Sequence, residues 1–201
     1  MIEPRKKQLR GEKTREKILK ISLKLFSEKG YDKVTVDEIV KKAAHQKGHF
    51  TNTFQQNRTF FSVRFIEVDN YYREVFRSFP VDMDATEKLF IFIRKLMRFL
   101  EEEMGKDLMK VIYSSALDSK EHTYFLNSNR SLFQIIRSLI EEAKEQNDID
   151  TDQSVTEISQ LITQSLMGII YHWGLNNSEQ SLESLSIPLT KTIINGLKTK
   201  N

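Results

Sequence analysis

The polar residues that follow Ala44 are the ones whose types and spacing could do chemistry. Within six positions the chain supplies a cation, an imidazole, a hydroxyl and an amide, in the order Lys47, His49, Thr51 and Asn52. Such groups form hydrogen bonds to phosphate oxygens and to base edges, and a helix that presents them fits the major groove of a DNA duplex. The pattern therefore predicts a nucleic-acid interface.

The sequence offers no competing catalytic arrangement. It has no Gly-rich phosphate loop and no metalloprotease spacing, and it contains no cysteine that could act as a nucleophile or a thiolate ligand. His45 and His49 are four residues apart and could bridge a metal ion, but no nearby carboxylate completes such a site. We therefore predict that the protein is not an enzyme, and we expect no metal and no cofactor.

Two short helices separated by a break would position these polar side chains. Thr35 and Glu38 have the spacing of a capping box, in which the hydroxyl accepts from an early backbone N–H and the carboxylate reaches back to the N–H of Thr35. A second short helix is expected over residues 46–53, followed directly by Phe54. There Phe50 and Phe54 share one face that can anchor to a core, so the polar residues point outward.

A family resemblance is carried by the run from Thr14 to Phe61, which is similar to the helix-turn-helix domain of TetR-type transcriptional regulators. The opening helix ends in LFSEKGY, the second helix reads TVDEIVKKA, and Lys47-Gly48 follows them. The resemblance implies a sequence-specific DNA-binding protein, most often a repressor. The DNA-binding residues predicted on this basis are Thr14, Arg15, Thr35, Gln46, Lys47, Gly48, His49, Thr51 and Asn52.

Several of these contacts have a stated physical reason. Lys47 suits a phosphate, and glycine at position 48 would let the backbone approach DNA closely, although glycine inside a helix costs up to ~1 kcal/mol relative to alanine. A tight helix start is the alternative reason for Gly48. Thr35 stands at the start of the second helix, where backbone N–H groups point toward an anion. In resembling proteins, residues matching Thr14 and Arg15 lie close to phosphate.

The third helix departs from the family pattern and leaves a second hypothesis open. His45 stands where an apolar residue is usual, Gln46 where Ser is usual, and Thr51 and Thr53 where Tyr is usual. Because aromatic hydroxyls there commonly touch phosphates in the family, the chain could instead be a helical homodimer with degenerate DNA recognition that acts through protein–protein contacts. Thr51 and Thr53 can still donate hydrogen bonds, so specific DNA recognition is the leading hypothesis.

The charge of the 201-residue chain is unevenly distributed. Residues 1–64 contain 16 Lys and Arg against 7 Asp and Glu, a net charge of +9, whereas the remaining residues contain 15 against 21, a net charge of −6. A basic end that coincides with the helix-turn-helix match indicates DNA binding. Residues 1–13 are expected to form a basic arm that either lies along a phosphate backbone or remains a solvated tail.

The fold class predicted for the whole chain is all-α. We expect a three-helix, helix-turn-helix DNA-binding domain over residues 14–60, whose first helix covers residues 14–29, and a C-terminal helical domain over residues 61–201. No segment has the pattern of a strand. The further helices are expected over residues 58–79, 84–104, 106–117, 121–146, 154–175 and 186–198.

Local signals set the expected ends of these helices. Gly105 should close the helix over residues 84–104, whose Glu101–Glu103 run is interpreted as a solvated face. The segment 147–152 contains three aspartates but lacks the Gly and distal Glu of a calcium loop, so we interpret it as a capped turn. The last helix is placed near Ser186 because Pro188 is tolerated only close to a helix start.

The resemblance implies further partners for the C-terminal domain. In similar regulators the last two helices of two subunits form a four-helix interface, so we expect a homodimer on a palindromic operator of double-stranded DNA. A small apolar or amphipathic inducer would bind among the helices of the C-terminal domain. Candidate ligand-binding residues are Phe90, Met97, Tyr113, Phe133 and Trp173.

Composition also bears on location. No apolar run approaches the ~20 residues of a membrane span, and the basic N-terminal residues have no apolar segment behind them that would make a secretory signal. The absence of cysteine fits a reducing compartment. We therefore expect a cytoplasmic protein with no membrane segment.

Overall fold

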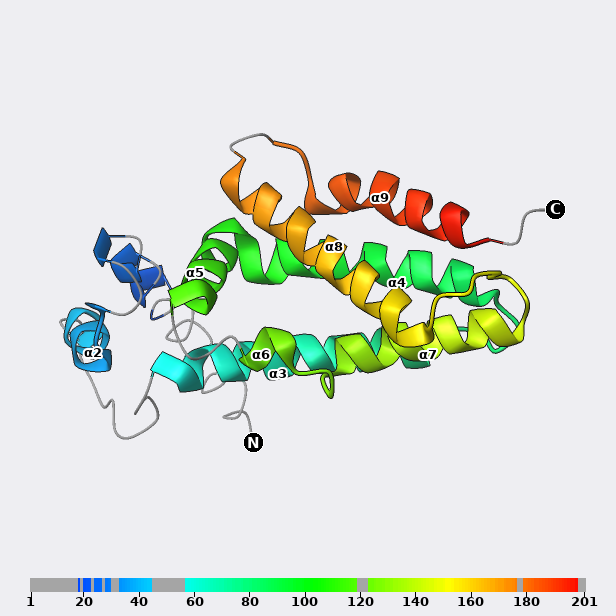
Figure 1. Cartoon of the computed structure of the whole chain (residues 1–201). Helices are drawn as coiled ribbons and strands as arrows, with labels where there is room; N and C mark the ends of the chain where they lie inside the picture. The colour runs from blue at the N-terminus through cyan, green and yellow to red at the C-terminus, as the bar shows by residue number, and fades with distance from the viewer. Residues whose placement is uncertain are drawn as a thin grey trace, which may run out of the picture. The chain divides into compact units, whose positions relative to one another are not determined.

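The computed structural model describes residues 18, 20–22, 24–26, 28–29, 33–44, 57–118, 123–176 and 179–198 (Figure 1). By their internal contacts the residues divide into two compact units, of which unit 1 comprises Met1–Val63 and Val111–His122 and unit 2 comprises Arg64–Lys110 and Thr123–Asn201. Throughout the described ranges the regular elements are helices, accompanied by an isolated bridge between Ile149 and Lys198. The prediction of an all-α fold is confirmed.

Unit 1 contains the first predicted helix and α2 (Val36–Ala44). Every described residue between 18 and 29 is helical. Ile18, Leu25 and Phe26 repeat at helical spacing and are buried, as predicted from their spacing. The α2 segment contributes its own buried residues, Ile39 and Ala43.

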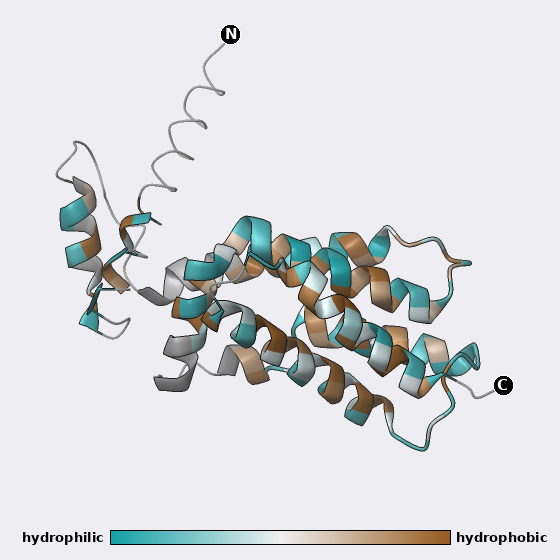
Figure 2. Cartoon of the chain, turned by 90° about the horizontal axis from the view of Figure 1, so that it is seen from above, coloured by the Kyte–Doolittle hydropathy of each residue, from teal (hydrophilic) through white to brown (hydrophobic). Residues whose placement is uncertain are grey.

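Unit 2 is a ring of helices around one core. It contains α4 (Ala85–Phe99), α7 (Ser131–Glu145), α8 (Val155–Leu175) and α9 (Leu182–Leu197). Helix α4 packs against α7 and α9, and α8 packs against the same two helices (Figure 1). Hydrophobic and hydrophilic residues alternate along these helices in Figure 2, as expected of helices with one face in a core. The fully buried side chains include Leu89, Phe92, Ile93 and Met97 of α4, Leu139 and Ile140 of α7, Ile158 and Ile162 of α8, and Leu182 of α9.

Two helices contribute residues to both units. Helix α3 (Asn57–Arg77) begins in unit 1 and continues into unit 2 after Val63. Helix α5 (Gly105–Asp118) begins in unit 2 and continues into unit 1 after Lys110.

The helix predicted over residues 84–104 changes geometry before its end. After α4, a π-helical turn η2 (Leu100–Met104) ends with a bond from the Gly105 N–H to the Leu100 carbonyl oxygen. Gly105 has φ 72° and ψ 161°, a region that only glycine occupies readily. The predicted break at Gly105 is confirmed, whereas the π-helical turn before it was not predicted.

The single long helix predicted over residues 121–146 is wrong. The structure has α6 (Thr123–Leu126) and α7 with a turn between them. In the turn Asn127 Oδ1 accepts from the Asn129 N–H at 3.0 Å, and Ser128 O accepts from Gln134 Nε2 at 3.0 Å. Short polar side chains compete for backbone groups in this way, so a run of them ends a helix whose apolar pattern continues.

The predicted start of the last helix is also wrong. Helix α9 begins at Leu182, and Ser181 serves as its N-cap by accepting from the Ser184 N–H at 3.1 Å. Pro188 therefore lies in the helix interior, where it removes a backbone donor. The polar residues before Pro188 are helical because the first turn has tertiary partners, which are described below.

The connection between α7 and α8 contains the three aspartates. Ser154 opens α8 with a reciprocal capping box, in which Ser154 Oγ accepts from the Glu157 N–H at 3.2 Å and Glu157 Oε2 accepts from the Ser154 N–H at 2.8 Å. The Lys144 ammonium donates to the carbonyl oxygens of Thr151 and Gln153 at 3.2 and 2.6 Å. The predicted capped turn is confirmed, and the described residues contain no group of side chains that could hold a metal ion.

Candidate nucleic-acid interface

Thr35 stands immediately before α2 and is exposed. Its hydroxyl oxygen accepts from the Glu38 N–H at 3.2 Å, and its carbonyl oxygen accepts from the Ile39 N–H at 3.1 Å. The predicted N-cap is confirmed. Because the hydroxyl oxygen accepts in this bond, its own proton remains available for donation to an acceptor such as a phosphate oxygen.

The second half of the predicted capping box is replaced by another contact. Glu38 Oε1 accepts from the Lys29 ammonium at 2.5 Å, so this carboxylate links α2 to the end of the first helix. A longer contact of 3.9 Å joins Lys42 of α2 to Glu28 of the first helix. Both pairs lie at the surface, where each stabilises the unit by about 1 kcal/mol or less. Glu38 near the start of α2 and Lys42 in its last turn are thus both joined to the end of the first helix.

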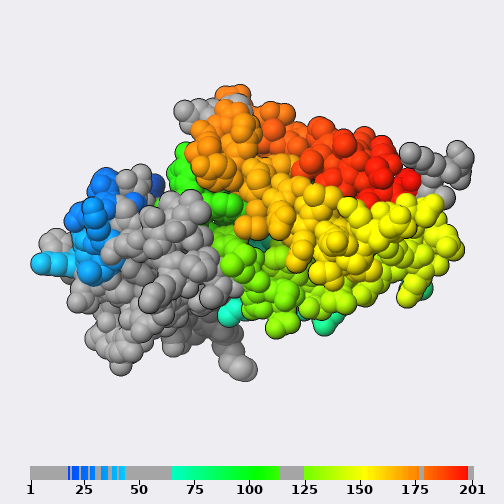
Figure 3. Space-filling view, viewed as in Figure 1, coloured from blue at the N-terminus to red at the C-terminus, as the bar shows by residue number. Residues whose placement is uncertain are grey.

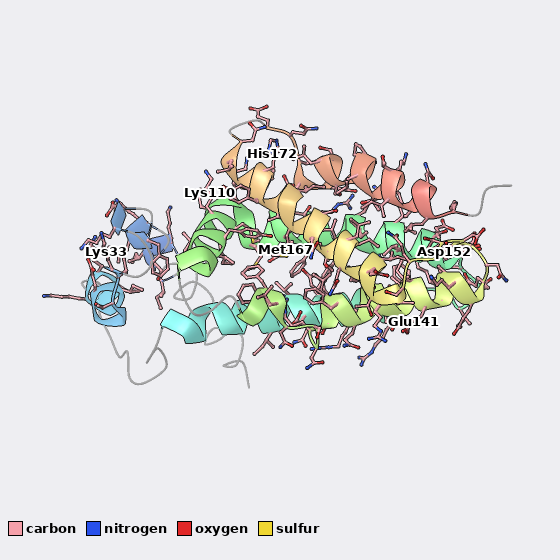
Figure 4. The ribbon with its side chains drawn as sticks, in the orientation of Figure 1. Lys33, Lys110, Glu141, Asp152, Met167 and His172 are labelled. Atoms are coloured by element: carbon pink, nitrogen blue, oxygen red, sulfur yellow. The ribbon has the colours of Figure 1, made fainter. Side chains whose placement is uncertain are left out.

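The described part of unit 1 carries exposed cations on both helices and on the link between them. Lys33, which precedes α2, is among the side chains labelled in Figure 4. Two carboxylates of this part of the chain, Glu28 and Glu38, already form ion pairs with lysines. The exposed lysines are Lys20, Lys24, Lys29, Lys33, Lys41 and Lys42.

Most of the predicted DNA-binding residues lie outside the described residues. Thr14 and Arg15 precede them, and the run from Gln46 to Asn52 falls between α2 and α3. Thr35 is the predicted DNA-binding residue whose surroundings the structure gives. The other eight stay predictions from the sequence: Thr14, Arg15, Gln46, Lys47, Gly48, His49, Thr51 and Asn52.

The five candidate ligand-binding residues have separate surroundings. Met97 is fully buried in the core of unit 2. Phe90 is half-buried on α4, with the Arg94 guanidinium 5.7 Å and the Lys191 ammonium 5.9 Å from its ring centroid. Phe133 is half-buried on α7. These three residues stay candidates for a ligand site.

The other two candidates lie elsewhere along the chain. Trp173 is buried near the end of α8, and the Lys106 ammonium lies 5.1 Å from its ring centroid. Tyr113 belongs to the part of α5 that is assigned to unit 1, and burial raises the pKa of its hydroxyl. At neutral pH the Tyr113 hydroxyl is therefore a protonated donor.

Helix α3 is fixed within unit 2 by residues that the sequence analysis missed. The Arg130 guanidinium donates to Asp69 at 3.0 and 3.4 Å and lies 5.7 Å from the centroid of the Phe65 ring. Arg73 donates to the Ser131 hydroxyl at 2.5 Å. Arg130 and Ser131 stand at the start of α7, so the turn after α6 delivers both groups to α3. The run of Asn127, Ser128 and Asn129 was the signal that could have revealed this turn.

One face of α8 presents apolar residues to solvent. Leu161, Tyr171 and Leu175 are 45, 48 and 64% exposed. Gly168 lies on the same face, and a Cβ built on it would meet no atom within 4 Å. We call these four residues the α8 stripe. Figure 3 shows that α8 and α9 lie next to each other on the surface of unit 2, and Gly196 of α9 also has open space above it.

None of the helices in the described part of the chain is both long enough and apolar enough to span a bilayer. Helix α8 has the length but carries Glu157, Gln160 and Gln164 between its apolar residues. Its apolar residues serve the core of unit 2 on one side and form the stripe on the other.

Comparison with known proteins identifies the N-terminal segment. Residues 18–59 match the family model of the bacterial regulatory proteins of the tetR family. This range includes the first helix, α2 and the start of α3. No curated protein matches the sequence.

Solved structures match the chain over nearly its whole length. A protein from Syntrophomonas wolfei, described as a TetR-family transcriptional regulator, has a TM-score of 0.72 at 20% identity, covering 95% of this chain and 100% of its own. Thermus thermophilus FadR, a TetR-family repressor in complex with lauroyl-CoA, has a TM-score of 0.58 at 19% identity, with 93 and 96% covered. RolR in complex with resorcinol has a TM-score of 0.53 at 16% identity, with 94 and 89% covered. At these identities the likeness is one of fold.

Proposed function

Because this chain belongs to the TetR family of DNA-binding transcriptional regulators, we propose that it is a sequence-specific repressor that a small apolar or amphipathic ligand releases from a palindromic operator. The family is not enzymatic. The observation that carries the proposal is the match of residues 18–59 together with the exposed start of α2 at Thr35. A protein that acts on a bacterial chromosome works in the cytoplasm, so we propose that location.

Unit 1 supplies the DNA-binding groups in this proposal. The Thr35 hydroxyl and the first N–H groups of α2 receive a phosphate, supported by exposed lysines nearby. Lys47 contacts a phosphate beside the N–H of Gly48, and His49, Thr51 and Asn52 reach base edges. We assign DNA binding to residues 14–60, with the basic arm 1–13 before them, and ligand binding and dimerisation to residues 61–201.

A homodimer is the assembly that the α8 stripe supports. Exposed apolar residues in helical register, with a glycine among them, let a second helix approach closely and bury apolar area. Two copies of α8 and α9 would then meet in a four-helix interface. A two-fold dimer places two DNA-binding domains on half-sites one helical turn apart, about 34–36 Å.

The ligand in this proposal acts through differential affinity for two arrangements of the dimer. A molecule that binds better when the DNA-binding domains do not match successive major grooves lowers operator affinity by that difference. Two proteins of similar fold are bound to lauroyl-CoA and to resorcinol in their solved structures. Both ligands have apolar and polar parts, which supports the class of ligand proposed here.

Selection from random DNA duplexes tests the function directly. Enrichment of one palindrome is expected, and the affinity for it should fall steeply as salt concentration rises. Lys47→Ala should weaken binding across sequences and reduce the salt slope by about 1. Lys95→Ala is the matched control, because Lys95 is an exposed lysine on α4 in unit 2.

The outcomes separate the two hypotheses for this chain. If selection enriches no duplex and affinity does not depend on salt, the protein is a helical homodimer that acts through protein contacts. If binding is salt-dependent but Lys47→Ala leaves it unchanged, the chain binds DNA through residues other than those proposed.

A further inference from the structure

The chain turns between α4 and α5, and side chains of this corner contact both the end of α8 and the start of α9. The corner consists of η2, Gly105 and Lys106. Glu101 lies before the Gly105 break and Lys106 lies after it. Each of the two side chains contacts the backbone at a different end of the α8–α9 connection.

Glu101 holds the beginning of α9. Leu182 is the first residue of this helix, and its backbone N–H donates to Glu101 Oε2 at 2.8 Å. Ser181 accepts from the Ser184 N–H, so the two side chains satisfy different unpaired donors of the first turn. A carboxylate here also faces the positive end of the helix dipole. The run Glu101–Glu103 is therefore not only the solvated face that the sequence predicted.

The same turn of α9 is held by α4. Glu183 accepts from Arg94 at 2.7 Å and from Arg98 at 2.8 Å. Arg94, Arg98 and Glu101 are spaced by four and three residues, so they lie along one face of the helix. Arg94, Arg98 and Glu101, one helical turn apart from each other, therefore all contact the first turn of α9.

Lys106 holds the end of α8. Its ammonium donates to the carbonyl oxygen of Asn176 at 2.9 Å, and Asn176 is the C-terminal cap of α8. The same ammonium lies over the Trp173 ring. A cation here faces the negative end of a helix dipole. Figure 4 shows Lys110 of α5 and His172 of α8 at this end of unit 2, and the Lys110 Cγ lies 3.6 Å from a Cβ built on Gly174.

An anion and a cation five residues apart therefore bind two helix ends of opposite polarity. The backbone between them passes through Gly105. Its φ of 72° is an angle that residues other than glycine rarely adopt. With both contacts made, the corner is joined to the end of α8 and to the start of α9. Lys106 lies in the first turn of α5 and Glu101 lies in the turn before Gly105, so the contacts to α8 and to α9 fall on the two sides of the glycine.

We propose that Glu101 and Lys106 are positioning residues that couple the α8–α9 pair to α5. Residues 105–110 of α5 belong to unit 2 and residues 111–118 belong to unit 1. A shift of α8 and α9, such as a second subunit would cause, is passed to the part of α5 that belongs to unit 1. The consequence for DNA rests on the proposed function, whereas the coupling itself does not.

Variants of the full chain test the coupling by two measurements. The test variants are Glu101→Ala, Lys106→Met and the double variant. The controls are Glu103→Ala on η2 and Lys95→Met on α4, which remove a charge of the same sign from an exposed position. Amide hydrogen exchange is followed at residues 111–118 and 182–184. Affinity for the selected duplex is followed separately, with circular dichroism and sedimentation to establish that the variants are folded and unchanged in assembly.

We expect faster exchange at residues 182–184 in Glu101→Ala and, in both single variants, faster exchange at residues 111–118. Operator affinity should change by about 5- to 150-fold, the range of ordinary coupling between sites. The two control variants should stay within about twofold of the original protein, as expected of exposed positions.

Unchanged exchange at residues 111–118, with faster exchange at 182–184, would overturn the proposal and leave Glu101 as a local helix cap. If the original protein selects no duplex, the proposed function fails, and the exchange measurement still decides the coupling. If Glu101→Ala does not fold, Glu101→Gln replaces it. That variant keeps an acceptor oxygen without the charge, and it should raise exchange at residues 111–118 by a smaller amount in the same direction.

Discussion

Arg130 joins the start of α7 to Asp69 and Phe65 of α3 within unit 2. The Arg130 and Asp69 side chains are 10 and 17% exposed and meet at 3.0 Å. Taking both charges out of water costs several kcal/mol, which their mutual attraction largely offsets. The pair therefore contributes little net stability as long as it is complete. Its effect is to hold α3 in one position on α7.

Removal of one partner should be costly. We expect Arg130→Ala to lower the free energy of unfolding by about 3–5 kcal/mol, because Asp69 is left as an uncompensated charge that is mostly buried. Urea unfolding followed by circular dichroism measures this. Arg137→Ala, which removes a pair that is 54 and 45% exposed, should cost about 0.5 kcal/mol or less. Equal losses in the two variants would contradict the role given to Arg130.

Glu183 makes stability depend on pH. Loss of solvation alone would raise the pKa of its carboxyl, but the hydrogen bonds and charges of Arg94 and Arg98 outweigh that and lower the pKa below the ordinary 4.5. The unfolded chain therefore takes up this proton first as pH falls. The contribution of Glu183 is fully present above the ordinary value and is lost as pH falls through the lower, folded value.

Glu183→Gln tests this sign. At about pH 7 the variant should unfold at a lower urea concentration than the original protein, since Arg94 and Arg98 lose their anion. Well below the ordinary carboxyl pKa the two proteins should converge. A difference that grows as the solution becomes more acidic would show that the carboxyl pKa is raised in the folded state.

At the scale of elements, apolar spacing was sufficient to predict α2, α3, α4 and α8 to within a few residues. Each has a buried stripe at helical spacing. The α6–α7 break was missed because Asn127 and Ser128 interrupt the backbone pattern while the apolar pattern continues on both sides. The start of α9 was placed too late because its first N–H is satisfied by Glu101, which lies 81 residues away in the sequence.

Within the candidate site, the structure describes Thr35 and its neighbours, and the same distinction between local and distant contacts holds there. The Thr35 cap is a local interaction across three residues and could be read from the sequence. The partner of Glu38 is Lys29, nine residues earlier on another helix, and it depends on how the two helices pack. Local hydrogen bonds follow from sequence spacing, whereas contacts between elements follow only from the fold.

Gly105 gives a prediction at this scale. Gly105→Ala should lower the free energy of unfolding by about 1–3 kcal/mol because alanine is strained at φ 72° and ψ 161°, although no atom lies within 4 Å of the new Cβ. Gly174→Ala is the control, since that glycine is helical and its Cβ would make only an ordinary contact of 3.6 Å. The control should be neutral or more stable by up to ~1 kcal/mol. Thermal unfolding at matched protein concentration measures both.

For the whole molecule, charge and exposed apolar residues lie in different parts of the chain. The N-terminal 64 residues carry a net charge of +9 and the remainder carries −6. Unit 2 carries the α8 stripe, in which Leu161, Tyr171 and Leu175 are exposed. A protein with these two surfaces can pair with its own copy through one of them and with a polyanion through the other.

The α8 stripe should therefore control assembly. We expect Leu161→Glu to shift the protein toward a monomer by at least about tenfold in dissociation constant, since a like charge meets its copy across a two-fold interface. Analytical ultracentrifugation measures this. Leu126→Glu is the matched control, because Leu126 is 73% exposed on α6, outside the stripe. If both variants remain dimers, the second subunit binds elsewhere.

The ammonium of Lys144 holds the α7–α8 connection by two carbonyl oxygens, in a segment rich in aspartate. A connection held by a lysine does not respond to the divalent ions of the medium, so a chelator should leave the order of residues 147–153 unchanged. Acylation of that amine would have the opposite effect, because the neutral amide that forms has a single N–H and cannot replace two charged donors. We therefore expect the order of this loop to depend on acylation of Lys144 and not on calcium.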